Sequence, residues 1–94
     1  MNLQQLAHAA ADYYGVAYVD LISPCRQAKF VRPRHICQWI AKDAGYKQSD
    51  IARFWRLDGS AVHYGCKMVQ NQLDTSKQAV EDLKKFMKHA RQWD

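Results

Sequence analysis

Cysteine, proline and glycine are scarce in this chain of 94 residues, which has three cysteines, two prolines and four glycines. The odd number of cysteines and the lack of a CxxC spacing argue against a disulfide framework and favour a reducing cytoplasm. No apolar run reaches the length of a membrane span, and the N-terminal segment lacks the features of a signal peptide. The glycines form no Gly-Lys pair, so the sequence contains no P-loop and predicts no bound nucleotide. We expect one globular domain over residues 1–94, large enough to bury a modest core.

Positive charge is in excess, at a net +5, and it is unevenly spread. Residues 1–23 contain two acidic residues and no lysine or arginine, whereas residues 24–57 contain eight basic and two acidic residues. Residues 58–94 are nearly balanced, with six basic and five acidic residues. A basic region of this kind is typical of nucleic-acid binding, although a solvated basic face is the common alternative on small proteins.

Apolar residues recur at helical spacing, so the sequence predicts an all-α fold, a helical bundle of five or six helices. The run at 16–19 is rich in strand-forming residues, but no second strand is available to pair with it. Gly15 is a natural end for the first helix, and Pro33 suits the first position of a later one, after a solvated loop at 23–31. The predicted helices are 3–14, 20–22, 34–44, 49–55, 60–73 and 77–89.

Residues 47–69 are the most informative stretch, because they fit two short helices joined by a tight turn at 56–59. Ser49 is a candidate N-cap of the first helix, and Asp58 or Gly59 caps the second. The apolar residues of the second helix recur at spacings of four, three and four, which places Val62, Cys66, Val69 and Leu73 on one face. Two helices joined in this way form a helix-turn-helix pattern. The outward face of the second helix carries Ser60, Ala61, His63, Tyr64 and Lys67.

Side chains that could suggest catalysis or metal binding lack the partners that either function needs. His63 and Cys66 lie one turn apart, but two further metal ligands at suitable spacing are missing. His35 is close in sequence to Cys25 and Cys37, yet no orienting acid or oxyanion turn accompanies them. We therefore expect no enzymatic activity, no metal and no cofactor.

Three successive segments together resemble a known family. They are AADYYGVAYVDLIS (10–23), RPRHICQWIAKDAG (32–45) and SDIARFWRLDGSAVHYGCKMV (49–69). In order and spacing they are similar to the C-terminal DNA-binding domain of DnaA, the bacterial replication initiator, over roughly residues 10–73. The aromatic pair, the Asp-Leu-Ile-Ser segment, the Arg-Pro-Arg helix start and the Asp-Gly-Ser-Ala-Val signature carry the resemblance.

The resemblance implies sequence-specific binding of double-stranded DNA. Helix 60–73 would lie in the major groove, and the basic loop 24–31 would reach the minor groove or phosphates. The candidate base-reading residues, with Tyr64 added from the following turn, are Asp58, Gly59, Ser60, Ala61 and Tyr64. Contacts to the DNA backbone or minor groove are expected from Arg26, Lys29, Arg32, Arg34, Lys47, Arg53, Arg56 and Lys67, although Arg34 could instead hold a carboxylate.

Two carried-over positions depart from the family pattern, which has histidine and threonine where this chain has Gly59 and Ala61. Glycine offers neither a side-chain hydrogen bond nor a contact to a thymine methyl group, and alanine offers only the latter. We therefore expect a DnaA-like scaffold with a target other than the DnaA box.

The chain contains no ATPase domain, so we expect a stand-alone module associated with the nucleoid in the cytoplasm. Its expected role is that of a small regulator of transcription or replication, of phage or mobile-element type. One module makes few base contacts, which favours a second copy or a protein partner. The alternative hypothesis is a protein–protein interaction module on the same fold, with weak or no DNA binding.

Overall fold

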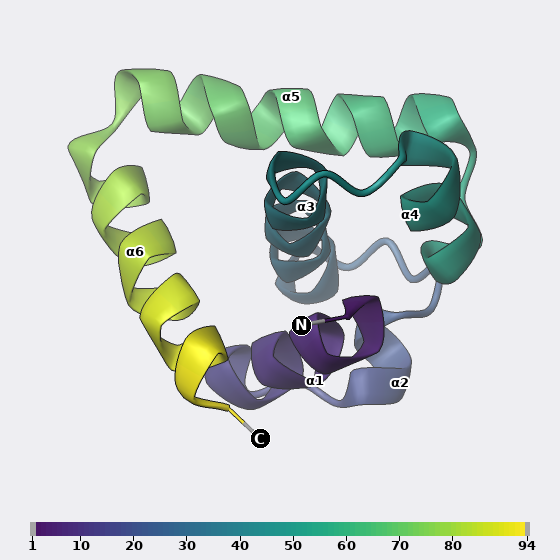
Figure 1. The fold of residues 1–94 in the computed structure, drawn as a ribbon, viewed down its shortest axis with the longest axis horizontal. Helices are drawn as coiled ribbons and strands as arrows, with labels where there is room; N and C mark the ends of the chain where they lie inside the picture. Colours follow the sequence, from purple (N-terminus) through teal and green to yellow (C-terminus); the bar gives the residue numbers. More distant parts are fainter. Residues whose placement is uncertain (1, 94) are drawn as a thin grey trace.

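The computed structural model describes residues 2–93, which form six helices and no strand, as the all-α prediction requires. Figure 1 shows α3 nearly end-on at the centre, with α5 crossing above it, α6 at the left, α1 below and α4 at the right. Within residues 2–93, no helix has the length and apolar character of a membrane span. The helices are α1 (Leu3–Tyr14), α2 (Tyr18–Leu21), α3 (Ala28–Asp43), α4 (Gln48–Trp55), α5 (Gly59–Thr75) and α6 (Lys77–Gln92).

The first helix begins and ends where the sequence predicts, because local signals fix both ends. Asn2 Oδ1 accepts a hydrogen bond from the backbone N–H of Gln5 (2.7 Å), and Gln5 Oε1 accepts one from the Asn2 N–H (3.0 Å). This capping box satisfies N–H groups that a helix start leaves open. Gly15 ends the helix in the left-handed conformation (φ 68°), which glycine adopts without steric penalty.

The prediction for the third helix was wrong at its start. This helix begins at Ala28 instead of residue 34, so Pro33 lies inside it and not at its first position. The carbonyl of Gln27 accepts hydrogen bonds from the N–H groups of Phe30 (2.9 Å) and of the next residue (3.0 Å), which closes the first turn. Phe30 and Pro33 are both buried. Their burial outweighs the one backbone hydrogen bond that a proline removes from a helix.

The core lies between α3 and the helices around it, and α6 is held to α1 by aromatic rings. The ring of Phe86 on α6 lies 5.4 Å from the rings of Tyr13 and Tyr14 on α1. Residues 16–19, which could have formed a strand, instead contain the start of α2, with Ala17 as its N-cap. The largest fully buried side chains are Trp55, Phe86, Leu21, Ile51, Gln38, Val62 and Cys37.

Close packing between α3 and α5 depends on a glycine. A Cβ at Gly65 would lie 2.6 Å from Cδ2 of His35 and 2.9 Å from Oε1 of Gln38, which is closer than real side chains approach. The absence of a side chain therefore lets α5 lie directly across α3. Val62, Gly65 and Val69 form the buried face of α5. Cys66, predicted on that face, is only half-buried.

The predicted helix-turn-helix is formed by α4 and α5, with small differences at the ends. α4 begins at Gln48 with Lys47 as its N-cap, so the prediction of Ser49 as the cap was wrong. Arg56 ends α4 in the left-handed conformation (φ 57°), the only residue other than glycine in residues 2–93 with a positive φ. α5 begins at Gly59, directly after Asp58 as N-cap. The turn between the two helices is therefore confined to residues 56–58.

Candidate nucleic-acid interface

The outward face of α5 carries a row of exposed side chains. Ser60, Tyr64, Lys67 and Asn71 are all exposed, and they follow one another at spacings of four, three and four. This spacing keeps residues on one side of a helix, so they form a continuous row, which we call the α5 ridge. The structure thus brings together three predicted contact residues, Ser60, Tyr64 and Lys67, and adds Asn71.

The start of α5 leaves an acidic side chain available to a ligand. Asp58 has the extended backbone of an N-cap (ψ 153°), but its side chain makes no capping hydrogen bond. The carboxylate is exposed and is free to accept a hydrogen bond, for which a cytosine amino group is a suitable donor. Gly59 and Ala61 are half-buried. These two predicted reading positions therefore present less surface than Asp58 and Ser60.

Gln48, the first residue of α4, fixes the start of α5 through a contact that the sequence did not predict. Its Nε2 donates a hydrogen bond to the carbonyl oxygen of Gly59 (2.9 Å), and its Oε1 accepts one from Nζ of Lys42 (3.0 Å). A Cβ at position 59 would lie 3.2 Å from Gln48 Nε2. The glycine therefore leaves the end of Gln48 undisturbed, and it removes the side chain that a base reader needs.

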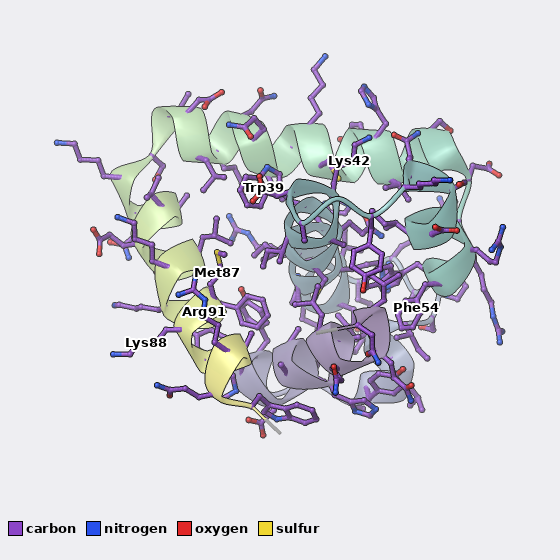
Figure 2. The ribbon with its side chains drawn as sticks, viewed as in Figure 1. Trp39, Lys42, Phe54, Met87, Lys88 and Arg91 are labelled. Atoms are coloured by element: carbon purple, nitrogen blue, oxygen red, sulfur yellow. The ribbon has the colours of Figure 1, made fainter. Side chains whose placement is uncertain are left out.

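One flank of the α5 ridge faces the C-terminal half of α3 across a hollow of about 590 Å³. Lys42 of α3 and Lys67 of α5 line this hollow with Trp39. The indole Nε1 of Trp39 donates a hydrogen bond to Oε1 of Gln70 on α5 (3.0 Å). Figure 2 shows Trp39 and Lys42 at the end of α3 beside α5. Asp43 also lines the hollow, so its two lysines face one carboxylate and leave a net positive charge that suits a phosphate. Lys42 was not among the predicted contacts because its position depends on the crossing of α3 and α5.

The other flank faces the N-terminal half of α3, where Arg32 and Tyr64 line a second hollow of about 380 Å³. Lys29 and Arg32 line a neighbouring hollow, and both side chains are exposed. The loop predicted at 24–31 is shorter than expected, because Lys29 lies in the first turn of α3. Arg26 remains in the connection before α3, where it is exposed. Basic side chains therefore border the α5 ridge on this side as well.

Arg34 is not available to DNA, so the prediction of a DNA contact at this residue was wrong. The residue is only 5% exposed. Its guanidinium group donates hydrogen bonds to the carbonyl oxygens of Leu21 (3.0 Å), Cys25 (2.9 Å) and Asp20 (3.4 Å). Burial lowers the pKa of Arg34 from its ordinary value, yet an arginine remains charged at neutral pH. Arg34 thus holds the connection between α2 and α3 through backbone carbonyls, not through a carboxylate.

The three remaining predicted contacts belong to the first helix of the helix-turn-helix. Lys47 and Arg56 cap the two ends of α4, and Arg53 lies in its last turn. Arg53 Nη1 lies 3.5 Å from Oδ1 of Asp50, but the Arg53 side chain is 81% exposed. An ion pair that exposed is weak, so Arg53 can exchange Asp50 for a phosphate.

Two of the three cysteines, Cys37 and Cys66, have structural surroundings that differ from those of reactive thiols. Cys37 is fully buried, and burial raises the pKa of its thiol far above the usual range. Cys66 is half-buried in the hollow that also contains His63, and burial raises the pKa of its thiol as well. Among the residues that the structure describes, no group of three or more His, Cys, Asp or Glu side chains could hold a metal ion.

Comparison with known proteins assigns this architecture to one family. The family model described as the bacterial dnaA protein helix-turn-helix matches residues 3–69, well over half of the chain. The chain belongs to the bacterial DnaA helix-turn-helix family. The resemblance inferred from the sequence is thereby confirmed. The matched part of this DnaA-type domain contains α1 to α4 and the α5 ridge as far as Lys67, whereas α6 lies outside it.

Individual relatives of the DnaA-type domain are longer proteins that are named as replication initiators. The chromosomal replication initiator protein DnaA of Ruegeria pomeroyi is 26% identical over 85 residues, which is 88% of this chain and 18% of the relative. The protein of the same name from Treponema pallidum is 29% identical over 89 residues, which is 90% of this chain and 19% of the relative. The chain thus spans about a fifth of the length of these relatives. Membership in the family implies binding to DNA.

Proposed function

We propose that this domain binds double-stranded DNA sequence-specifically, with the α5 ridge in the major groove. The observation that carries the proposal is the position of the ridge between two basic surfaces. Lys42 lies on one side, in the hollow that Lys67 of the ridge also lines. Arg32 lies on the other side, in the hollow that Tyr64 lines, and Lys29 lies next to it. A helix in the major groove lies between two phosphate backbones, and this pair of basic surfaces suits that position.

Base reading in this arrangement begins at the start of α5. Asp58 accepts a hydrogen bond from a cytosine amino group. The Ser60 hydroxyl both donates and accepts, so it can bind a donor or an acceptor on the edge of a base. Gly59 and Ala61 offer no polar side chain, so the target differs from the DnaA box. Arg26 and Lys29 contact the minor groove or the phosphates beside it. Contacts from α4 to phosphates come from Lys47, Arg53 and Arg56.

The biological role that fits such a domain is regulation of transcription or replication, in a phage or mobile element, without an enzymatic step. A single copy makes only a few base contacts. Specificity sufficient to find one site in a genome therefore requires a second copy or a protein partner on the same DNA.

A titration of labelled random duplex, followed by fluorescence anisotropy, tests DNA binding directly. We expect a dissociation constant on the order of micromolar, as for non-specific binding by other proteins. If six phosphates are neutralised, log K should fall against log salt with a slope of roughly −5. A folded protein that binds no duplex at about 50 mM salt would sink the proposal.

Paired lysine variants test the location of the interface. Lys42→Ala/Lys67→Ala should make the salt slope shallower by about 2, because two phosphate contacts are lost. The matched control is Lys84→Ala/Lys88→Ala, which removes two exposed lysines from α6. The control should leave the slope unchanged, with circular dichroism confirming that both variants are folded. An equal change in both double variants would contradict the assignment of the interface to α5.

Exposed apolar side chains on α5 favour a second candidate function, docking to another protein. Tyr64 is 60% exposed and Met68 is 38% exposed, and apolar surface of this kind often marks an interaction site. The same anisotropy titration separates the two candidates. Folded protein without salt-dependent binding to duplex would favour the protein-docking function.

A further inference from the structure

The outward face of α5, along which the α5 ridge runs, has an apolar side and a polar side. Ala61, Tyr64 and Met68 follow one another at spacings of three and four, and we call them the apolar stripe. Tyr64 and Met68 line the hollow against the N-terminal half of α3. Both are well exposed, at 60% and 38%, whereas Ala61 is half-buried. The opposite edge of the ridge is polar and carries His63, Lys67 and Gln70.

Packing within the domain does not account for the apolar stripe. Tyr64 and Met68 both lie outside the hydrophobic core cluster. The ring of Tyr64 meets the ring of His35 edge-on with centroids 6.3 Å apart, a contact that leaves most of Tyr64 exposed. Adjacent exposed apolar residues are more informative than single ones, because a contiguous apolar patch is typical of a binding surface. Arg32 lines the same hollow as Tyr64 and Met68, and this cation favours a polyanionic ligand over an apolar protein surface.

The edges of the base pairs in the major groove present one apolar group, the C5 methyl of thymine, among nitrogen and oxygen donors and acceptors. We propose that the apolar stripe reads thymine methyl groups, so that Tyr64 and Met68 select thymines in the target. This inference rests on the proposed function, because it requires the α5 ridge to lie in the major groove. The inference adds Met68 to the base-reading residues, and it makes the contact between Tyr64 and the base an apolar one.

The positions of the stripe residues along α5 predict how far apart the thymines lie. Tyr64 and Met68 are four residues apart, which corresponds to about 6 Å along the axis of a helix. Bases along one strand are separated by about 3.4 Å. With α5 following the groove, the two side chains meet thymines about two base steps apart on one strand.

A scan with deoxyuridine tests this inference, because deoxyuridine pairs as thymidine does and lacks only the C5 methyl. The domain is first used to enrich bound duplexes from a random pool, and each thymine of an enriched duplex is then replaced singly. We expect about fourfold weaker binding for each contacted methyl, at two thymines on one strand. Replacement of the other thymines should leave the affinity unchanged.

Variants of the stripe assign each thymine to a side chain. Tyr64→Ser and Met68→Gln should each lose the sensitivity to deoxyuridine at one of the two thymines, so that duplexes with thymine or deoxyuridine there bind equally well. The salt dependence of binding should stay that of the parent. The matched control is Val19→Ser, because Val19 is an apolar residue of α2 that is 68% exposed. This control should keep the full sensitivity to deoxyuridine. Circular dichroism checks that all three variants fold.

The possible results separate the inference from the proposed function. Failure to bind any duplex overturns both. Binding that tolerates deoxyuridine at every thymine overturns the thymine assignment alone, and DNA binding as a function stands. Sensitivity that persists in both stripe variants likewise overturns the assignment to Tyr64 and Met68. Sensitivity that disappears in these two variants and persists in Val19→Ser supports it.

Discussion

α1 and α5 differ in how their ends are closed and in how much of each is buried. α1 has a side-chain cap at its start and a left-handed glycine at its end, and it buries Leu6 and four alanines. α5 is longer, yet it buries only three residues and starts without a side-chain cap. The difference indicates that α1 mainly contributes stability, whereas α5 keeps polar and apolar groups available for a ligand. Substitutions in the two regions should therefore separate stability from DNA binding.

The largest expected loss of stability is at the contact between α1 and α6. Phe86→Ala removes a fully buried ring that packs against Tyr13 and Tyr14. We expect the free energy of unfolding to fall by about 3–5 kcal/mol, measured by urea denaturation. The affinity of the folded variant for duplex DNA should be unchanged. A weaker affinity under conditions where the variant is folded would show that the two regions are coupled.

Gly65→Ala should have the next largest effect, because it affects the packing that supports α5. The new methyl group would collide with His35 and Gln38. Overpacking is partly offset by the better helix propensity of alanine, so we expect a net loss of about 1–2 kcal/mol in urea denaturation. DNA affinity should fall too, because α5 must shift. At the control position, Gly59→Ala, the methyl meets only the flexible end of Gln48, so a smaller loss of stability is expected there.

A comparison of the two N-caps should give a smaller difference. Asn2→Ala removes the capping box of α1 and should lower the free energy of unfolding by about 1 kcal/mol. Asp58→Ala removes no capping hydrogen bond, and in about 0.5 M salt its interaction with the helix dipole is screened. Its stability should then match that of the parent, while its affinity for enriched DNA falls. Equal losses of stability in the two variants would contradict the structural difference between the caps.

The smallest expected effect is a pH dependence due to His35, which is half-buried at the α3–α5 contact. Burial and the neighbouring Arg34 lower the pKa of His35 below 6.5. At pH values between the lowered pKa and 6.5, His35 binds more protons in the unfolded chain than in the folded protein. The free energy of unfolding therefore decreases as the pH falls below about 6.5. The site is partly exposed and screened, so we expect a few tenths of a kcal/mol. Urea denaturation at about pH 7.5 and about pH 5.5 would measure it, and His35→Gln should remove this contribution.

Features fixed by neighbouring residues could be predicted from the sequence. The bounds of α1 follow from Gly15 and a short apolar pattern, both of which act within one or two turns. The helix-turn-helix and the outward position of Ser60, Tyr64 and Lys67 follow from helical spacing alone. The family resemblance also rests on the order of motifs along the chain, which does not depend on tertiary contacts.

Features that depend on tertiary packing could not be predicted. Pro33 was expected to start a helix, and the burial of Phe30 and Pro33 explains the earlier start of α3. Arg34 was grouped with exposed cations, because a charge count does not show that three backbone carbonyls surround it. Gln48 was overlooked because its partner, the carbonyl of Gly59, approaches it only after α4 and α5 have packed.

Arg34 also determines how freely the segment before α3 can move. Its hydrogen bond to the carbonyl of Cys25 holds the backbone on one side of Arg26, and the start of α3 after Gln27 holds the other. Fixing the backbone of a residue costs about 1–2 kcal/mol of conformational entropy. Much of that cost at Arg26 is already met when the domain folds. The backbone at Arg26 is therefore preorganised, so the proposed contact of Arg26 with DNA should require little further ordering of the main chain.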